Sequence, residues 1–441
     1  MLPGDGGVLS KRKVTVIFFS WIVCAVDGGM SGNSDVVLIP IGAISQAQPV
    51  ICRKGEFMRD DIEHKIRKLE EKGVVIIDPR QTYISPEVDI DRIYKGCVLY
   101  PGCRLTGERT LVGTSAQIGT EGPAVIHNSI IGAEAEVGSG FLLDSTLLPR
   151  AKAGANVHFR GGTLLEEYAT TAHCVGLKQS ILMYSVTLGS LINFCDVLIS
   201  GGCSRKEHTE VGSGFIHFNF TPWGKNGDKA TPSLVGNVTD GVFLDQKRIF
   251  LGGLSGMVGP ASVGFGSMTV AGQVIRHPVA DSTMHAETGS NIDKSCSFSG
   301  VAFSERRFRQ IYEKNAEFLA QLYALKEWYL HIRLRRRRLQ GDLELSLVLN
   351  GAIETIQSCM RERVSRYNSL AAEWSLAPMN ESILEKEGAP VDVSVDWRTD
   401  LAYDEWIKGV GEEEREGLHR WLLHLKSGFK NDFPLDFSSE I

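Results

Sequence analysis

The sequence predicts a mainly β protein, in which a parallel β-helix of hexapeptide repeats is followed by an α-helical C-terminal region. Aliphatic residues recur at steps of six between residues 80 and 285. Glycine accounts for 47 of the 441 residues, well above its usual share of about 7%. After residue 300 the apolar period becomes helical. A period of six fits short strands joined by tight turns, and it suits neither a helix nor simple strand alternation.

Residues 1–57 are interpreted as an N-terminal extension. The basic triplet 11–13 precedes an apolar stretch, 14–26, which is like the start of a secretory signal but too short to span a bilayer. The extension is attributed to an over-long start assignment, with Met58 as the alternative start, whereas the signal-like stretch leaves export open. The nine cysteines contain no C-x-x-C pair, which favours a reducing, cytoplasmic location. The net charge of −6 gives no global argument for binding nucleic acid or membranes.

Residues 58–79 are expected to form a helical lead-in and a linker. Ile62, Ile66 and Leu69 share one helical face, and Gly73 is a suitable C-terminal stop. The following VVIIDP has the pattern of a short strand ended by proline.

The β-helix is predicted to span 80–285, with one aliphatic residue in six pointing inward and glycine permitting the turns. Each coil would bury its face only against its neighbours. An irregular tract at 150–250 contains the insertion-like NFTPWGKNGDKATPS, and functional groups tend to lie on such departures. The predicted inward positions are Leu99, Leu105, Leu111, Val112, Ile118, Val125, Ile131, Val137, Leu143, Leu251, Met257, Val263, Thr269 and Ile275.

The C-terminal third is predicted to contain an α-helical hairpin at 300–376, interrupted at Gly341, and an acidic linker and last helix within 377–441. The basic run 333–338 is interpreted as a solvated face at a helix C-terminus, where positive charge is favourable. The competing interpretation is a patch for anions or an acidic partner.

Two stretches, GVVIIDPRQTYISPEVDI (73–90) and YPGCRLTGERTLVGTSAQIG (100–119), resemble the linker and C-terminal half of the bifunctional UDP-N-acetylglucosamine pyrophosphorylase / glucosamine-1-phosphate N-acetyltransferase family. The resemblance covers roughly 60–285. It implies a left-handed β-helix, a homotrimer and a role in amino-sugar metabolism for cell-envelope precursors. The Gly-rich phosphate loop of that family's nucleotidyltransferase half has no counterpart here, so pyrophosphorylase chemistry has no visible machinery.

The resemblance implies that Arg160, in RGG, and Lys178, in KQS, hold a sugar phosphate, because the family has an arginine and a lysine at this spacing. Eighteen residues are three hexapeptides, or one full coil, so the two cations should lie on adjacent coils, about 4.8 Å apart. Cations this close repel unless an anion lies between them. The alternatives are that both point to solvent, or that Glu166 and Glu167 neutralise them.

Further substrate and cofactor contacts follow from the same comparison. Asn219 matches the asparagine of a family loop in which Phe220 replaces tyrosine, and Lys229 corresponds to a lysine that follows. The segment VAGQVIR resembles the end that binds acetyl-CoA or another acyl-CoA. It implies cofactor contacts from Ala271, Gly272 and Arg276.

The family's catalytic histidine is replaced by Ser190, although the nearby aspartate is kept as Asp196. Acyl transfer to an amine needs a positioned base, and serine is too weak for this at neutral pH. Four histidines in the middle tract could supply one, unless they are turn or surface residues. We favour His173 and His217, which lie close in sequence to Lys178 and Asn219, over His158 and His208. The four lack a compact ligand spacing, so no metal is predicted.

Three functions stay open at this point. The first is an acyltransferase acting on an amino-sugar phosphate of the UDP-N-acetylglucosamine pathway. The second is a non-catalytic subunit that binds a sugar phosphate or nucleotide sugar, with the C-terminal helices contacting a protein partner. The third is a subunit supporting a nucleotidyltransferase supplied by another chain. The Arg–Lys spacing favours the first, and the missing histidine favours the second.

Overall fold

The computed structural model describes residues 15–18, 21–26, 35–40, 50–52, 54–220, 229, 231–286, 304–397 and 400–433, with side chains from residue 62 onward. The chain forms two compact units, 1–68 and 69–441. Among the described residues no helix is both long and apolar enough to cross a membrane. The first unit contains a four-stranded antiparallel sheet, formed by β1 (Thr15–Phe18), β2 (Trp21–Val26), β3 (Asp35–Pro40) and β4 (Val50–Cys52).

The lead-in to the repeat is helix α1 (Lys54–Glu71), which ends two residues before Gly73. Gly73 adopts a φ of +89°, a conformation that glycine takes without strain at a helix end. Leu69 is fully buried. Two 3₁₀ turns follow, η1 (Pro79–Gln81) and η2 (Ile90–Arg92).

The predicted parallel β-helix is confirmed, and its coils have three faces. The first face stacks eleven strands: β5 (Val75–Ile76), β7 (Val98–Leu99), β10 (Gln117–Ile118), β13 (Glu136–Val137), β16 (Lys152–Ala153), β19 (Thr170–Thr171), β21 (Thr187–Leu188), β23 (Glu210–Val211), β26 (Phe250–Leu251), β29 (Met268–Thr269) and β31 (Met284–His285).

Two strands, β20 (Gly176–Leu182) and β22 (Asn193–Ile199), bend around a corner and join the second face to the third. The second face also contains β6 (Tyr83–Ile84), β8 (Arg104–Thr106), β11 (Ala124–His127), β14 (Gly140–Leu143), β17 (Val157–Phe159), β24 (Ile216–Phe218), β27 (Gly256–Val258) and β30 (Val274–Ile275). The third face also contains β9 (Leu111–Val112), β12 (Ile130–Ile131), β15 (Ser145–Leu147), β18 (Thr163–Leu165), β25 (Ser233–Val235) and β28 (Ser262–Val263).

The interior follows the six-residue period with two corrections. Val125 and Leu143 were expected inside but are partly exposed, whereas their neighbours Ile126 and Leu142 are buried. The segment between the buried Ile118 and Ile131 is one residue longer than two hexapeptides. Successive strand residues point to opposite sides, so a one-residue shift exchanges the inner and outer positions.

The predicted C-terminal helices are confirmed, and the hairpin turns at Gly341, whose φ is +73°. Asp342 caps the second arm through its side chain. The first arm is continuous through a π-helical turn. The helices are α3 (Glu305–Trp328), the π-helix η3 (Tyr329–Leu334), α4 (Arg335–Gln340), α5 (Leu343–Glu373), α6 (Tyr403–Gly409) and α7 (Glu412–Asn431), with short α2 (Val238–Gly241) inside the repeat and the 3₁₀ turn η4 (Glu381–Glu385).

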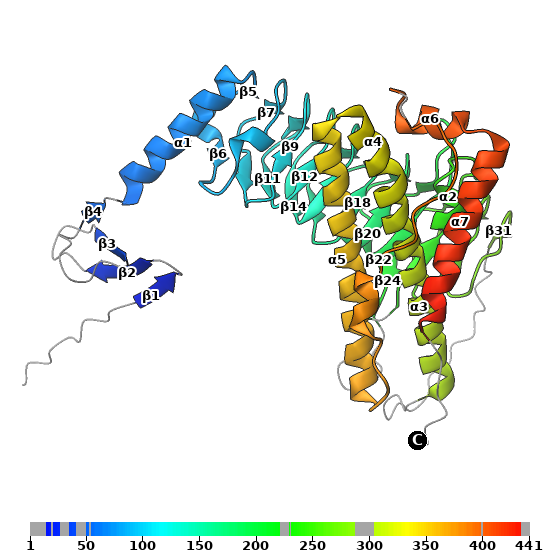
Figure 1. The fold of residues 1–441 in the computed structure, drawn as a ribbon. Helices are drawn as coiled ribbons and strands as arrows, with labels where there is room; N and C mark the ends of the chain where they lie inside the picture. The colour runs from blue at the N-terminus through cyan, green and yellow to red at the C-terminus, as the bar shows by residue number, and fades with distance from the viewer. Residues whose placement is uncertain are drawn as a thin grey trace, which may run out of the picture. The chain divides into compact units, whose positions relative to one another are not determined.

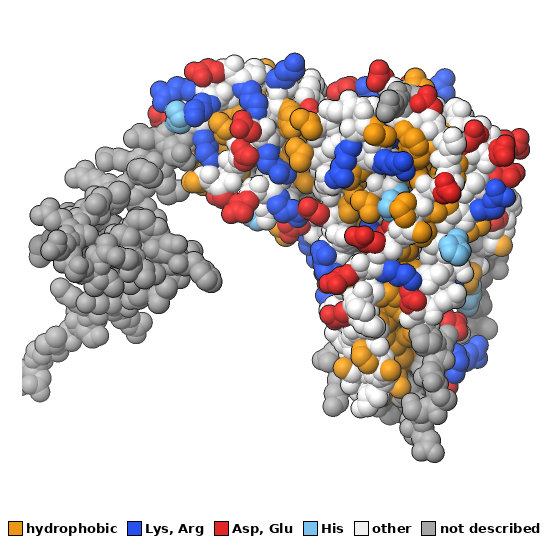
Figure 2. Space-filling view, viewed as in Figure 1, with side chains coloured by type: hydrophobic (Ala, Val, Ile, Leu, Met, Phe, Trp, Pro, Cys, Tyr) orange, Lys and Arg blue, Asp and Glu red, His pale blue; other side chains and the backbone are white. Residues whose placement is uncertain are grey.

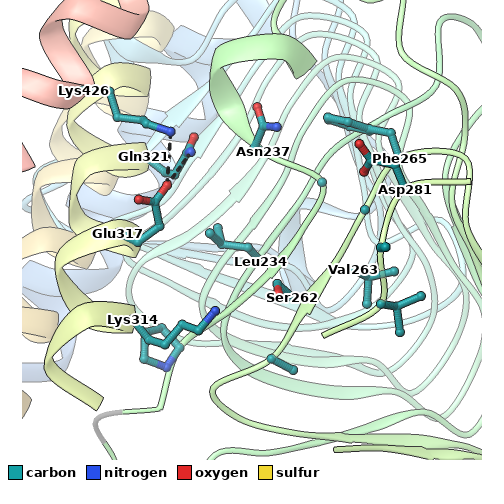
Figure 3. A pocket seen from close by; sticks show the side chains of 16 residues that line it. Leu234, Asn237, Ser262, Val263, Phe265, Asp281, Lys314, Glu317, Gln321 and Lys426 are labelled. Carbon is teal, nitrogen blue, oxygen red and sulfur yellow. Dashed lines mark hydrogen bonds and ion pairs between the residues drawn. The ribbon is translucent and has the colours of Figure 1, made fainter. Parts of the chain in front are cut away.

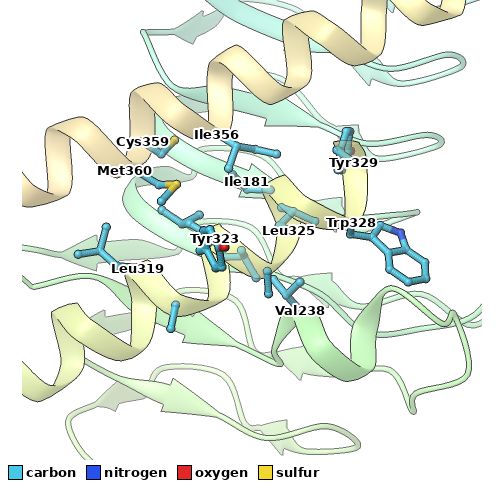
Figure 4. Close-up of a cluster of buried hydrophobic side chains, with 14 of the residues drawn as sticks. Ile181, Val238, Leu319, Tyr323, Leu325, Trp328, Tyr329, Ile356, Cys359 and Met360 are labelled. Atoms are coloured by element: carbon cyan, nitrogen blue, oxygen red, sulfur yellow. The ribbon is translucent and has the colours of Figure 1, made fainter. Parts of the chain in front are cut away.

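The hairpin packs on the third face, and this packing forms an extended apolar core. Helix α5 contacts β12, β15, β18 and β20, while α3 packs between α5 and α7 (Figure 1). Figure 4 shows Ile181 of the β-helix among Leu319, Tyr323 and Ile356 of the helices. On the visible outer surface, acidic and basic side chains are interspersed with apolar ones (Figure 2), which agrees with the modest net charge.

The interpretation of 333–338 as a solvated face is wrong for two of its arginines, because Arg333 and Arg336 are buried. Arg333 pairs with Glu167 and, at 3.6 Å, with Glu166. The Tyr329 hydroxyl donates to Glu166 Oε1 at 2.6 Å. Both glutamates follow β18, so this buried network connects the helices to the β-helix. It also excludes the alternative in which Glu166 and Glu167 neutralise Arg160 and Lys178.

We predict that Arg333→Met destabilises the protein by about 3–5 kcal/mol, because it leaves two buried carboxyl groups without their cation. Denaturant unfolding monitored by circular dichroism measures the change. The exposed Arg338 provides the control, and Arg338→Met should change stability by no more than about 0.5 kcal/mol. Equal effects of the two substitutions would contradict the assigned role of Arg333.

Candidate functional site

The fold places Arg160 and Lys178 next to each other on the second face. The register pairs His158 with Gly176 and Phe159 with Leu177, so the next position aligns the two cations. The backbone N–H of Arg160 donates to Leu177 O at 2.8 Å, and its side chain is exposed. The guanidinium Nη2 lies 3.5 Å from Cys195 Sγ. Among the described residues, no carboxylate pairs with Arg160.

Lys178 has a partner that comes from the C-terminal hairpin. Glu362 of α5 places Oε1 3.4 Å from Lys178 Nζ and 2.9 Å from Arg366 Nε. Partial burial opposes ionisation of Glu362, but the hydrogen bond from Arg366 and the charges of Arg366 and Lys178 lower its pKa. Two cations therefore meet one ionised carboxylate.

The corner after these cations is occupied by Asp196, which is buried and has a φ of +61°. Its Oδ2 accepts from Asn219 Nδ2 at 2.8 Å, and its Oδ1 accepts from Arg363 Nη2 at 3.1 Å. Arg363 also donates to the backbone carbonyl of Lys229 at 3.2 Å, while Lys229 Nζ lies 5.9 Å from the Phe220 ring. The predicted loop residues therefore lie together, although Thr221 and Pro222 of that loop are outside the described residues.

His217 is buried, and both of its ring nitrogens are used internally. Nδ1 lies 2.5 Å from Cys195 O and Nε2 lies 2.9 Å from Ser233 Oγ. Burial lowers the pKa of His217 to about 4. A neutral ring that donates to the carbonyl must accept from the serine hydroxyl, so neither nitrogen is available to a substrate. The prediction of His217 as a base is not supported by this geometry.

His173 is exposed and lies next to Ser190, the residue that the resemblance aligns with the family's catalytic histidine. Ser190 Oγ is 3.0 Å from His173 Nδ1, and the backbone N–H of Leu191 donates to His173 O at 3.1 Å. The two residues therefore occupy the same corner on adjacent coils, where the first face meets the second. Nε2 of His173 has no hydrogen-bond partner among the described residues.

The predicted cofactor residues belong to the last coils at that same corner. The backbone N–H of Gly272 donates to Gly253 O at 3.0 Å. This bond belongs to the same row of backbone hydrogen bonds between successive coils in which the carbonyl groups of His173 and Ser190 accept. Ala271, Gly272 and Arg276 are exposed. Gly272 has a φ of +73°, and a Cβ built there meets no atom within 4 Å.

The two remaining histidines lie in different places. His158 is exposed on the second face, two residues before Arg160, and its ring is 5.4 Å from that of Phe141. His208 lies in a loop, with Nδ1 2.9 Å from Arg205 O. In the part of the chain that the structure describes, no group of three or more His, Cys, Asp or Glu side chains could hold a metal ion.

Sequence reasoning missed the contribution of α5, namely Glu362, Arg363 and Arg366. A signal was present, because Arg363 falls on the same helical stripe as the buried Ile356, Met360 and Tyr367. A charged residue on a buried stripe is almost always paired. The identity of its partner, Asp196, could not be read from the local pattern.

A separate cavity of about 480 Å³ lies between the third face and helices α3 and α7. Figure 3 shows Lys314 and Glu317 on its helical side and Ser262 and Val263 on its strand side. Glu317 accepts from Lys426 at 3.2 Å and from Gln321 at 3.1 Å. None of the predicted site residues is among the described residues that line this cavity.

The chain is similar in sequence to a group of proteins that share one name. It is 28% identical over 236 residues to the bifunctional protein GlmU of Staphylococcus haemolyticus, covering 54% of this chain and 45% of that protein. Its identity to the bifunctional protein GlmU of an Exiguobacterium species is 27% over 242 residues, covering 55% of this chain and 46% of that protein. Its identity to the bifunctional protein GlmU of Bifidobacterium adolescentis is 27% over 231 residues, covering 52% of this chain and 44% of that protein. The chain spans under half the length of these relatives. No protein-family model matches the chain. The similarity bears out the resemblance to the bifunctional family and is consistent with its acetyltransferase half.

We predict that His217 makes stability fall as the pH drops from about 6.5 to 4. In this window the unfolded chain binds a proton at His217, whereas the folded chain, with its pKa near 4, does not. The full contribution is present above pH 6.5, and about 3 kcal/mol is lost toward pH 4. Urea unfolding at several pH values should show a shallower loss for His217→Gln than for the wild type. Parallel pH profiles would contradict the buried neutral state.

Proposed function

We propose that this chain binds an amino-sugar phosphate on the second face of its β-helix and transfers an acyl group to the amine. The similarity to GlmU supports an acetyltransferase of this general type. The adjacency of Arg160 and Lys178 is the observation that carries the proposal. Two cations on neighbouring coils, with the arginine exposed and without a described carboxylate, are suited to a phosphate group. Arginine supplies a planar fork and lysine a point charge.

His173 is the residue we propose as general base. It lies five residues before Lys178 on the same coil, so their Cα atoms are at most about 17 Å apart. The two long side chains, with a hexosamine phosphate between them, can bridge that span. Ser190 orients the ring through Nδ1, which leaves Nε2 directed to the substrate. When the amine nitrogen attacks the thioester carbonyl, the C–N bond forms and the amine proton passes to Nε2. The C–S bond then breaks, and the departing thiolate of coenzyme A takes the proton from Nε2. This relocates the family's base by one coil.

Acetyl-CoA is the acyl donor we propose, with Ala271, Gly272 and Arg276 as contacts. The open surface over Gly272 and the exposed guanidinium of Arg276 fit a large anionic nucleotide thioester. The thioester supplies the electrophilic carbon. The proposed trimer would have to use the first and second faces, because α5 and α3 cover much of the third.

A non-catalytic binding subunit is the second candidate, and one observation favours it. Helix α5 pairs with both Lys178 and Asp196, so the chain's own hairpin takes part in the site. Such a protein would bind the sugar phosphate without turnover.

We expect Lys178→Met to raise KM for glucosamine-1-phosphate by about 10- to 100-fold, the loss of one hydrogen bond to a charged group. His173→Ala should lower kcat by about 10²- to 10⁴-fold. Thiol release from acetyl-CoA is the measurement. Lys152, which pairs with Glu136 on the first face at 2.9 Å, is the control, and Lys152→Met should behave like the wild type. Binding of glucosamine-1-phosphate without thiol release would replace the transferase with the binding subunit. Absence of both would reject each candidate.

A further inference from the structure

We infer that α5 completes the anion site, with Arg366 as a third cation and Glu362 as an internal counter-ion that the phosphate of the ligand displaces. This inference rests on the proposed function, because it concerns the same site. It also specifies the ligand as a doubly charged phosphate group rather than a neutral sugar.

The backbone of α5 is anchored on both sides of Glu362. Three residues before it, Cys359 Sγ donates to Gly162 O at 3.1 Å. One residue after it, the buried Arg363 pairs with Asp196 at 3.1 Å. Both contacts are with corner residues of the β-helix, so the helix has a fixed register against these coils. The Cα atoms of Glu362 and Arg366 are therefore held beside Lys178, and only the Glu362 side chain has to move.

The contacts of Glu362 resemble those that a phosphate oxygen would make. A single oxygen, Oε1, lies within 3.4 Å of Lys178 Nζ and 2.9 Å of Arg366 Nε. The side chains of Lys178 and Glu362 are 32% and 27% exposed, so water reaches the pair and its net contribution is small. A phosphate dianion carries twice the charge and three acceptor oxygens. It can contact Lys178, Arg366 and Arg160 together, which one carboxylate does not do.

The experiment measures binding of glucosamine-1-phosphate and of uncharged N-acetylglucosamine by calorimetry at low salt. Glu362→Gln should bind glucosamine-1-phosphate up to about fivefold more tightly, since the competing ion pair is partly exposed. Binding of N-acetylglucosamine should not change. Arg366→Gln should bind the phosphate at least fivefold more weakly. Adding Lys178→Met to Glu362→Gln should abolish the gain.

Glu354 provides a matched control on the same helix, because it pairs with Arg109 at 2.5 Å away from this site. Glu354→Gln should leave the affinity unchanged, and unfolding midpoints verify that each variant folds. If Glu362→Gln and Arg366→Gln both bind glucosamine-1-phosphate as tightly as the wild type does, the inference is overturned while the proposed function stays intact. If neither the wild type nor any variant binds glucosamine-1-phosphate, the proposed function is overturned and this inference with it.

Discussion

The hydrogen bonding between successive coils is the constraint on which the rest of the structure depends. Each short strand bonds only to the strands above and below it, so residues about one coil apart must lie over one another. That rule brings Arg160 to Lys178 and His173 to Ser190. It also forces a left-handed backbone at the corners, where Gln179 and Asp196 adopt positive φ values. The geometry of the candidate site is therefore a property of the stack, and individual side chains adjust only its details.

The C-terminal hairpin adds side chains from outside the repeat to the candidate site of the β-helix. An apolar face is covered by α3 and α5 of the same chain, and the contact is fixed by buried charges from both sides. Arg333 reaches Glu166 and Glu167, and Arg363 reaches Asp196. Since Asp196 also bonds Asn219, the helices and the candidate ligand site share one polar network. The contacts that dock the hairpin on the β-helix therefore also position the residues of the candidate site.

Local periodicity was sufficient to predict the β-helix and the hairpin, because each depends on residues close in sequence or on a strict repeat. The alignment of Arg160 with Lys178 also needed the three-sided coil that the family resemblance implies. Periodicity failed at Val125 and Leu143, because the buried residue beside each lies five residues, and not six, from the nearest inward position, which exchanges inside and outside. It also failed for His217, whose ring is held between Cys195 and Ser233 of neighbouring strands, and for Arg333, whose environment is created by a distant segment. Arg333 meets Glu166 across more than a hundred residues of chain, and no local pattern records that contact.

The position of α5 across several coils has a consequence for how the protein unfolds. A bare stack is nearly one-dimensional, so its terminal coils can separate without disturbing the middle. Helix α5 contacts β12, β15, β18 and β20, which belong to successive coils, and it binds them all through one rigid rod. Because one rigid helix contacts all of these coils, unfolding of any one of them also disrupts the contacts of the others. The central coils, which contain the candidate site, therefore behave as one cooperative unit, while the coils that none of the C-terminal helices contacts keep the independence of a simple repeat.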